Sequence, residues 1–184
     1  IMDPFIKEIQ HINNVDDAIN KLNTQTEITP KLNEIINFII EAHEGQYRKS
    51  GEPYCVHPIL VASITAHFSK DEAIIATALL HDVVEDTKYP LDYIKERWGS
   101  DIAHMVDGLT KIVEIRENEF ITSSDASDSK IISSALTFRK MLIASIDDVR
   151  VLIVKLCDRL HNMLTLGVLP ANKQKRIAEE TLVV

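Results

Sequence analysis

Residues 79–87, Leu-Leu-His-Asp-Val-Val-Glu-Asp-Thr, hold an imidazole and three carboxylates at close spacing. His81 and Asp82 are adjacent, and Glu85 and Asp86 follow one helical turn later. In a helix, positions i, i+3 and i+4 share a face, so the three carboxylates would lie together. The apolar run before His81 predicts a buried helix, and burying such groups without partners costs several kcal/mol. The pattern therefore favours a metal site. The alternative is a capped helix with an exposed acidic end, which the helix dipole disfavours.

A second stretch, Lys155 to Met163, shows a similar arrangement. Asp158 directly follows a strongly apolar run, and polar side chains recur three, four and seven positions later at His161, Asn162 and Thr165. These positions share one helix face that continues a buried stripe. The alternative interpretation of Asp158 is an ion pair with a neighbouring basic residue, Lys155 or Arg159.

His57, His81, Asp82 and Asp158 would together supply two imidazoles and two carboxylates to one ion. Nitrogen and oxygen ligands without a thiolate suit Mn²⁺, Fe²⁺ or Zn²⁺. Such an ion polarises phosphoryl oxygens and lowers the pKa of a bound water. A carboxylate beside the ligands can then orient that water or move its proton.

Composition limits the class of protein. Hydrophobic residues make up 45% of 184, and the low counts of Gly (5) and Pro (6) favour long helices. The net charge of −8 argues against direct DNA binding. No apolar run approaches the ~20 residues of a membrane span. Cys55 and Cys157 lie in apolar context, which indicates a reducing cytoplasm rather than a disulfide framework.

The spacing of apolar residues along the chain predicts a series of helices joined by short polar segments. Asn13-Asn14 interrupts the first apolar pattern, so residues 4–23 form one or two helices. Thr29-Pro30 is typical of a helix start, and His57, which precedes a proline, is predicted to cap the helix that follows it. The polar, low-complexity composition of residues 117–130 predicts a mobile loop. The remaining predicted helices are 30–43, 59–68, 71–84, a short helix that starts at 88–90, 101–116, 136–146, 149–164 and 173–184.

Five ordered blocks resemble one known family. They are Arg48-Lys49-Ser50-Gly51-Glu52-Pro53-Tyr54 with His57-Pro58, then residues 81–87, 106–111, 138–141 and 155–163. Together they resemble the hydrolase domain of the Rel/SpoT alarmone enzymes, within the HD phosphohydrolase superfamily. These enzymes remove the 3′-pyrophosphate from guanosine tetra- and pentaphosphate, giving GDP or GTP and pyrophosphate, and so act in the stringent response. Leu164 departs from the pattern, because many members carry a basic residue there.

The resemblance implies an all-α fold, an HD-domain helical bundle, and it implies a role for each site residue. A manganese ion would be held by His57, His81, Asp82 and Asp158. Glu85 and Asp86 would be the catalytic carboxylates. Arg48 would stack on the guanine base, Lys49 and Asn162 would contact the nucleotide, and Thr165 would line the pocket.

The resemblance also bears on domain organisation. We expect residues 1–184 to form a single HD-type hydrolase domain. Residues 176–184 resemble the segment that leads into the synthetase domain of long relatives, so we expect an N-terminal fragment of a bifunctional enzyme with synthetase and regulatory domains. Two alternative functions are a phosphohydrolase acting on another nucleotide and a non-catalytic domain that binds guanine nucleotides. The loop from Arg48 to Tyr54 argues against the first, and the presence of Glu85 and Asp86 argues against the second.

Overall fold

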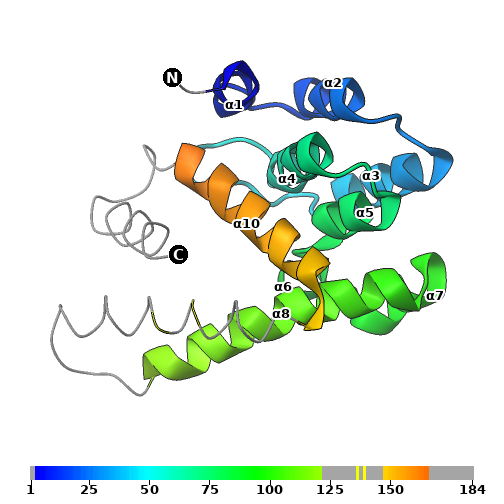
Figure 1. Cartoon of the computed structure of the whole chain (residues 1–184), viewed down its shortest axis with the longest axis vertical. Coiled ribbons are helices and arrows are strands. Elements are labelled where there is room, and N and C mark those ends of the chain that lie inside the picture. Colours follow the sequence, from blue (N-terminus) through cyan, green and yellow to red (C-terminus); the bar gives the residue numbers. More distant parts are fainter. Residues whose placement is uncertain (1–2, 122–135, 137–138, 140–146, 166–184) are drawn as a thin grey trace, which may run out of the picture.

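The computed structural model describes residues 3–121, 136, 139 and 147–165, and of residues 112–121 it describes only the backbone (Figure 1). The elements in these ranges are all α-helices, and one isolated β-bridge joins Tyr47 to Pro53 within a loop. None of the helices described is both long enough and apolar enough to cross a membrane. The predicted all-α fold is confirmed.

Two helices form the N-terminal layer, α1 (Pro4–Gln10) and α2 (Val15–Gln25). The sequence left one or two helices open, and the break follows from Asn14, whose side-chain oxygen accepts from the Asp17 backbone N–H at 2.9 Å. Such caps satisfy N–H groups that lack an intrahelical partner. Phe5 of α1 stacks on the ring of His67, with centroids 4.3 Å apart, and so fixes α1 to the rest of the domain.

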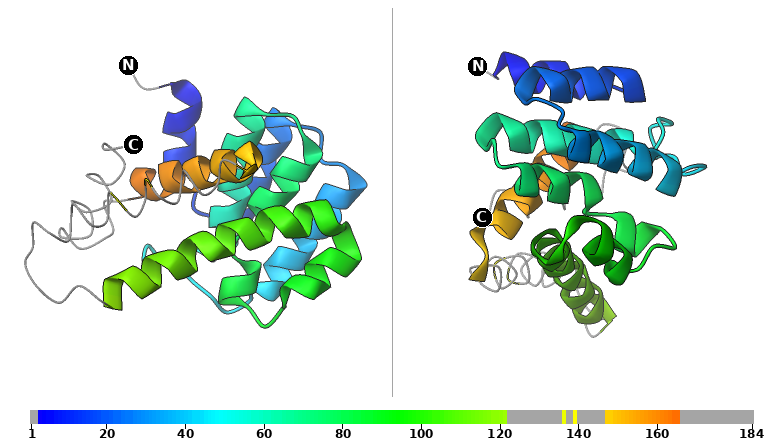
Figure 2. Two further views of the ribbon diagram at one scale, coloured as in Figure 1. Left: turned by 60° about the horizontal axis from the view of Figure 1, so that its bottom comes forward. Right: turned by 90° about the vertical axis from the view of Figure 1, so that its right-hand side faces the viewer.

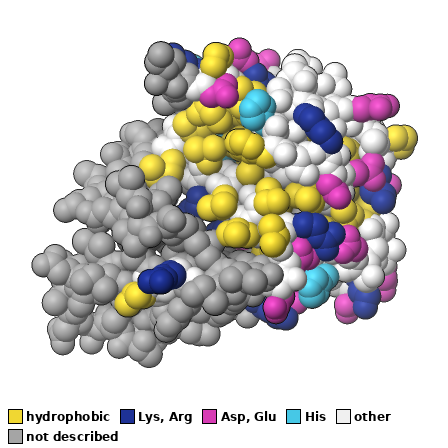
Figure 3. Space-filling model, viewed as in Figure 1, with side chains coloured by type: hydrophobic (Ala, Val, Ile, Leu, Met, Phe, Trp, Pro, Cys, Tyr) yellow, Lys and Arg dark blue, Asp and Glu magenta, His cyan; other side chains and the backbone are white. Residues whose placement is uncertain are grey.

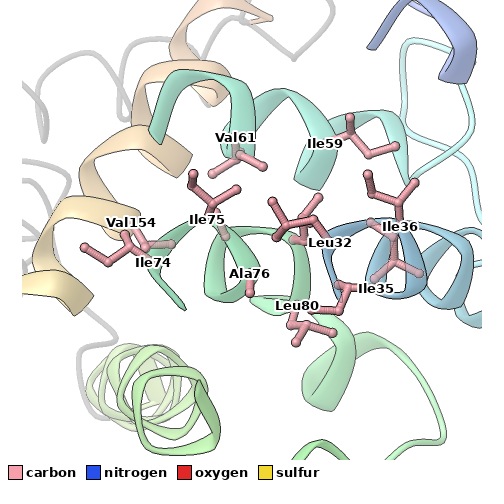
Figure 4. Packing of buried hydrophobic residues seen from close by; sticks show 14 of the residues in the cluster. Leu32, Ile35, Ile36, Ile59, Val61, Ile74, Ile75, Ala76, Leu80 and Val154 are labelled. Atoms are coloured by element: carbon pink, nitrogen blue, oxygen red, sulfur yellow. The ribbon is translucent and has the colours of Figure 1, made fainter. Parts of the chain in front are cut away.

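The centre of the core is built from α3 (Pro30–Ala42), α4 (Val56–Phe68) and α5 (Glu72–Leu80). Thr29 caps α3 as predicted, accepting from the Leu32 backbone N–H at 3.2 Å. Residues 56–66 of α4 are all buried, because this helix packs against α2, α5 and a later helix at once. A helix that is apolar on all sides is expected in such a position. Figure 4 shows the isoleucine, leucine and valine side chains of α3, α4 and α5 that fill the space between them.

The chain then continues through α6 (Val83–Asp86), α7 (Leu91–Trp98) and α8 (Ser100–Ile121). Pro90 precedes α7 rather than lying in its first turn, and Gly99, with φ of +99°, ends it. The start predicted at 88–90 was therefore slightly early. Because α8 extends to Ile121, residues 117–121 are helical, and the prediction of a loop there was wrong. Residues 122–130 of that loop, most of 136–146 and all of 173–184 lie outside the described residues.

The last described helix, α10 (Val149–Leu164), crosses the domain and packs against α4, α5 and α8. Asp148 caps it, accepting from the Arg150 backbone N–H at 3.1 Å. Figures 1 and 2 show α10 running between the layer of α4 and α5 and the long α8. This crossing brings residues about a hundred positions apart in the sequence into contact, such as His57 and Asp158.

An apolar groove of about 330 Å³ lies between the end of α4 and α10. Phe68, Ile153, Leu156 and Leu160 line it. Figure 3 shows hydrophobic side chains gathered on this face of the molecule. The outward side of α10 is therefore apolar here, while its inward side carries the polar residues considered next.

Candidate metal centre

His81 and Asp82 lie in a break between α5 and α6, so the prediction of one continuous helix over 71–84 was wrong. The α5 helix ends at Leu80, and Asp82 is the N-cap of α6. The break keeps the local spacing of the carboxylates, because the Asp86 backbone N–H donates to the Asp82 carbonyl oxygen at 3.0 Å. It also buries His81, whose side chain is 5% exposed. The sequence contains neither Gly nor Pro here that would have marked the break.

His57 lies in the first turn of α4, and the prediction that it caps this helix was wrong. The helix begins at Val56, and His57 is its second residue. Pro58 follows as the third residue and tolerates this position, because the first N–H groups of a helix have no intrahelical acceptor. The turn directs the buried His57 ring toward α10, where its Nε2 lies 2.9 Å from Asp158 Oδ1.

Four predicted ligands converge. His81 Nε2 lies 2.9 Å from Asp82 Oδ2 and 3.4 Å from Asp158 Oδ1, and His57 Nε2 lies 3.7 Å from Asp82 Oδ2. Donor atoms bound at about 2.1 Å from one ion lie roughly 3.0–3.4 Å from one another. The donor atoms of His57, His81 and Asp158 all lie within 4.8 Å of one another. The distances therefore fit a single divalent cation among these side chains.

The hydrogen bond of His81 Nδ1 leaves Nε2, the ring nitrogen that faces the site, free to bind a metal. Its Nδ1 lies 2.6 Å from the carbonyl oxygen of Ala78, which accepts only if Nδ1 carries a proton. Among the described residues, no group is aligned to form a hydrogen bond with the buried Nε2. A histidine that donates from one ring nitrogen to a backbone carbonyl and directs the other at an ion is the usual arrangement of a ligand.

His161 orients His57 in a similar way, and sequence reasoning assigned it no role. His57 Nδ1 lies 2.6 Å from His161 Nδ1, and Arg48 Nη1 lies 3.2 Å from the same atom. Because arginine only donates, His161 Nδ1 is the acceptor for both groups. His57 then carries its proton on Nδ1 and keeps the Nε2 lone pair free. The position of His161 three residues after Asp158 was the available signal, but its partners are 104 and 113 positions away.

The charges in the site favour a cation. Burial lowers the pKa of His57. Burial also opposes the charged form of His81, but Asp82 and Asp158 outweigh it and raise its pKa well above the ordinary value. Burial opposes ionisation of both aspartates, yet His81 holds the pKa of Asp82 below its usual range, and Lys155 and His57 do the same for Asp158. Two ionised carboxylates thus share a buried space with imidazoles.

Lys155 pairs with the side of Asp158 that faces away from the imidazoles. Its Nζ lies 3.1 Å from Asp158 Oδ2, while Oδ1 faces His57. The ion pair that competed with the ligand interpretation therefore exists, and it leaves Oδ1 directed into the site. The two interpretations of Asp158 are compatible.

Glu85 and Asp86 lie at the rim of the site, partly open to solvent. Partial burial, and then the charges of Asp82 and Asp86, raise the pKa of Glu85 to about 7. Partial burial and Asp82 raise the pKa of Asp86, and a hydrogen bond from Tyr54 partly offsets this. A carboxylate with a pKa near 7 is suited to exchange protons at neutral pH.

Tyr54 joins one predicted ligand to one predicted catalytic carboxylate. Its hydroxyl lies 2.7 Å from Asp82 Oδ2 and 3.2 Å from Asp86 Oδ2. Burial and Asp82 raise the pKa of Tyr54 far above its ordinary value, so the phenol stays protonated and donates. Sequence reasoning quoted Tyr54 only within a motif, because its partners lie 28 and 32 positions later.

The loop from residue 48 to 54 holds Arg48 over the end of α10. The Gly51 backbone N–H donates to the Arg48 carbonyl oxygen, and the Arg48 N–H donates to the Glu52 carbonyl oxygen, each at 2.9 Å. Gly51 has φ of +98°, which favours glycine at this turn.

Three of the four residues predicted to bind the substrate meet at the end of α10. Arg48 Nη2 donates to Asn162 Oδ1 at 3.0 Å and approaches Thr165 Oγ1 at 3.4 Å. Lys49 is exposed on the loop beside them.

These helices and this His-Asp centre define an HD domain, and the chain belongs to that family. A family model described as "HD domain" matches residues 36–184. The match includes all four predicted ligands and both predicted catalytic carboxylates. The family-level resemblance drawn from the sequence motifs is therefore confirmed.

Curated relatives carry names from alarmone metabolism. A "GTP pyrophosphokinase" of Myxococcus xanthus is 49% identical over 142 residues, which are 77% of this chain and 18% of that protein. A "Guanosine-3′,5′-bis(diphosphate) 3′-pyrophosphohydrolase" of Haemophilus influenzae is 46% identical over 142 residues, 77% of this chain and 20% of the relative. The "Bifunctional (p)ppGpp synthase/hydrolase SpoT" of Escherichia coli K12 is 42% identical over the same share of this chain and 19% of its own length. The chain spans about a fifth of these relatives.

A solved structure shares the fold. It is described as a metazoan ortholog of SpoT that hydrolyzes ppGpp and plays a role in starvation responses. The TM-score is 0.62 at 23% identity, covering 84% of this chain and 85% of that one. At this identity, the likeness shows a common architecture.

Proposed function

We propose that this domain is a metal-dependent hydrolase that removes the 3′-pyrophosphate from guanosine tetra- and pentaphosphate. The observation that carries the proposal is the convergence of His57, His81, Asp82 and Asp158 with the carboxylates of Glu85 and Asp86 at its rim. The names of the curated relatives give the substrate class, and the Arg48 loop supplies a place for the nucleotide.

Within this proposal, His57, His81, Asp82 and Asp158 hold one manganese ion. Mixed nitrogen and oxygen ligands without thiolate suit this metal. When bound, a divalent ion polarises the phosphoryl oxygens and lowers the pKa of water.

Glu85 acts as the general base in this scheme. With a pKa of about 7, its carboxylate can accept a proton from the attacking water near neutral pH. The water oxygen forms a bond to the phosphorus attached to the 3′ oxygen, and the bond between that phosphorus and the 3′ oxygen breaks. The 3′ oxygen takes up a proton, which leaves GDP or GTP and pyrophosphate.

Asp86 orients the same water in this proposal. Its carboxylate accepts from Tyr54, which also donates to Asp82. The phenol therefore links one proposed metal ligand, Asp82, to one proposed catalytic carboxylate, Asp86.

Arg48, Lys49, Asn162 and Thr165 bind the nucleotide in this proposal. A guanidinium stacks well on an aromatic face, and an ammonium serves phosphate as a point charge. Arg48 already contacts Asn162 and Thr165, so the three form one surface beside the metal site.

We further propose that the chain is one domain of a longer cytoplasmic protein with synthetase and regulatory domains. The relatives support this, since the chain matches only 18–20% of their length. Two free, buried cysteines are consistent with a reducing compartment.

The proposal is tested by incubating the protein with guanosine tetraphosphate and Mn²⁺ and separating the products by ion exchange. We expect GDP and pyrophosphate, and we expect Mg²⁺ or Zn²⁺ at the same concentration to support less turnover. Binding of the nucleotide without turnover under any of these metals would refute hydrolysis and favour a regulatory domain. Turnover that is faster with another nucleotide would instead refute the substrate assignment.

A further inference from the structure

Gln46, in the loop after α3, contacts the turn that carries the two proposed catalytic carboxylates. Its side-chain Nε2 donates to the Asp86 carbonyl oxygen at 2.6 Å. The Gln46 side chain is partly buried, and the two residues lie 40 positions apart in the sequence. Sequence reasoning assigned Gln46 no role, because no local pattern indicates a partner so far along the chain.

The α6 turn needs a contact of this kind because it has only four residues. A single helical turn is not stable by itself, and the last carbonyl groups of a helix lack an intrahelical donor. Its own hydrogen bonds are those from the Asp86 N–H to the Asp82 carbonyl oxygen at 3.0 Å and from the Thr87 N–H to the Val83 carbonyl oxygen at 3.1 Å. Among the residues that the structure describes, only the Gln46 amide forms a hydrogen bond with the α6 backbone from another element. It therefore holds the end of α6 from outside.

His43 fixes the orientation of the Gln46 amide. Its Nδ1 lies 2.9 Å from Gln46 Oε1. Because the Asp86 carbonyl oxygen only accepts, the amide nitrogen faces Asp86 and the amide oxygen faces His43, whose Nδ1 then carries the proton. His43 is 2% exposed, and its ring lies against the ring of Tyr54, with centroids 4.9 Å apart. A buried, packed imidazole thus leaves the amide one orientation.

The backbone of Gln46 also holds Tyr54. The Gln46 N–H donates to the His43 carbonyl oxygen at 3.0 Å, and the Gln46 carbonyl oxygen accepts from the Tyr54 N–H at 2.9 Å. The Tyr54 hydroxyl in turn donates to Asp82 and Asp86. Gln46 therefore contacts Asp86 directly and also supports the tyrosine that joins Asp86 to a proposed metal ligand.

We propose that Gln46 is a positioning residue that holds Asp86 in place beside the metal centre through its bond to the Asp86 backbone. This inference rests on the function proposed above. Within the described part of the chain, the Gln46 side chain forms hydrogen bonds with His43 and Asp86 and with none of the proposed metal ligands or nucleotide-binding residues. Loss of its bond to Asp86 should therefore slow turnover and leave metal and nucleotide binding unchanged.

The test uses two substitutions that remove the same hydrogen bond. Gln46→Glu has nearly the same shape and keeps an acceptor for His43, but its carboxylate has no donor for the Asp86 carbonyl oxygen. Gln46→Met removes both bonds without adding a charge. Gln25→Glu is the matched control, because Gln25 Oε1 also lies beside a histidine, 3.0 Å from His67 Nδ1, at the opposite end of α4 from the metal centre.

Three measurements separate positioning from general support of the site. Hydrolysis of guanosine tetraphosphate with Mn²⁺ gives kcat and KM, electron paramagnetic resonance gives Mn²⁺ affinity, and hydrogen exchange reports the order of residues 82–87. Both Gln46 variants should lower kcat roughly ten- to hundredfold, as expected for a misplaced catalytic group. KM and Mn²⁺ affinity should stay within about twofold, since the hydrogen bond contributes to neither, and exchange at 82–87 should become faster. Gln25→Glu should match the wild type in all three.

A kcat within twofold of the wild type in either Gln46 variant would overturn the assignment. An equal loss of kcat and Mn²⁺ affinity would also overturn it, because Gln46 would then support the whole centre. If the wild type does not hydrolyse the nucleotide, the proposed function fails and hydrogen exchange decides the inference: faster exchange at 82–87 in the Gln46 variants supports it, and unchanged exchange overturns it. Either variant is sufficient if the other does not fold.

Discussion

Replacing Tyr54 by phenylalanine should weaken metal binding although Tyr54 is not itself a ligand. The substitution removes a hydroxyl that donates to Asp82 Oδ2 at 2.7 Å and to Asp86 Oδ2 at 3.2 Å. A hydrogen bond to a charged group contributes about 1.5–3 kcal/mol, and loss of a group that orients a metal ligand typically lowers affinity about 10–100-fold. The shorter bond is to Asp82, so we expect Mn²⁺ affinity to fall by roughly tenfold or more.

The same substitution should change the pH profile in a defined direction. The hydrogen bond from Tyr54 lowers the pKa of Asp86, so its loss raises that pKa. The acidic limb of kcat/KM should therefore move to higher pH in Tyr54→Phe.

Electron paramagnetic resonance of free Mn²⁺ measures the affinity directly, and initial rates from pH 5 to 9 give the profile. Tyr89→Phe is the matched control, because Tyr89 packs its ring against Phe38, and the structure shows no hydrogen bond from its hydroxyl to any described residue. The reasoning fails if Tyr54→Phe binds Mn²⁺ within twofold of the wild type.

Three further predictions concern the ligands and the catalytic carboxylates. His81→Ala or Asp82→Ala should abolish both metal binding and hydrolysis; full manganese occupancy in metal analysis of either purified variant would contradict the ligand assignment. Glu85→Gln should keep the metal and lower kcat about 10²–10⁴-fold, the usual contribution of a general base, and Asp86→Asn should behave similarly; wild-type rates in both would exclude the proton-handling role. Mn²⁺ binding near pH 7 should release protons, because the cation favours the deprotonated forms of His81 and Glu85, whose pKa values are raised. Affinity should then increase with pH, and calorimetry in two buffers of different ionisation enthalpy should give different apparent enthalpies; equal enthalpies would rule this out.

Local signals predicted most of the helices. Thr29-Pro30 and Asp148 cap α3 and α10 because their side-chain oxygens satisfy first-turn N–H groups, an effect that depends on neighbouring residues alone. Polar groups at helical spacing after apolar runs likewise indicated His81, Asp82 and Asp158. The structure brings these three together with His57, as the pattern predicted.

For features that depend on tertiary contacts, the sequence-based predictions were wrong or absent. The break at His81–Asp82 interrupts a run of good helix formers, so packing of the site overrides local propensity. The rule that a residue before proline avoids the α region misplaced His57, because the first turn of α4 tolerates Pro58. Tyr54 and His161 act on partners far along the chain, and no spacing rule predicts such pairs.

Under the proposed function, the two donors that converge on His161 Nδ1 would couple nucleotide recognition to metal binding. A nucleotide that draws Arg48 onto its base leaves the lone pair of His161 to His57 alone, so the hydrogen bond that orients a ligand changes when substrate binds. Free-energy coupling between two bound species is reciprocal, so the ion must change nucleotide affinity by the same factor. In the proposed enzyme, one buried histidine would thus make nucleotide affinity depend on the concentration of free metal.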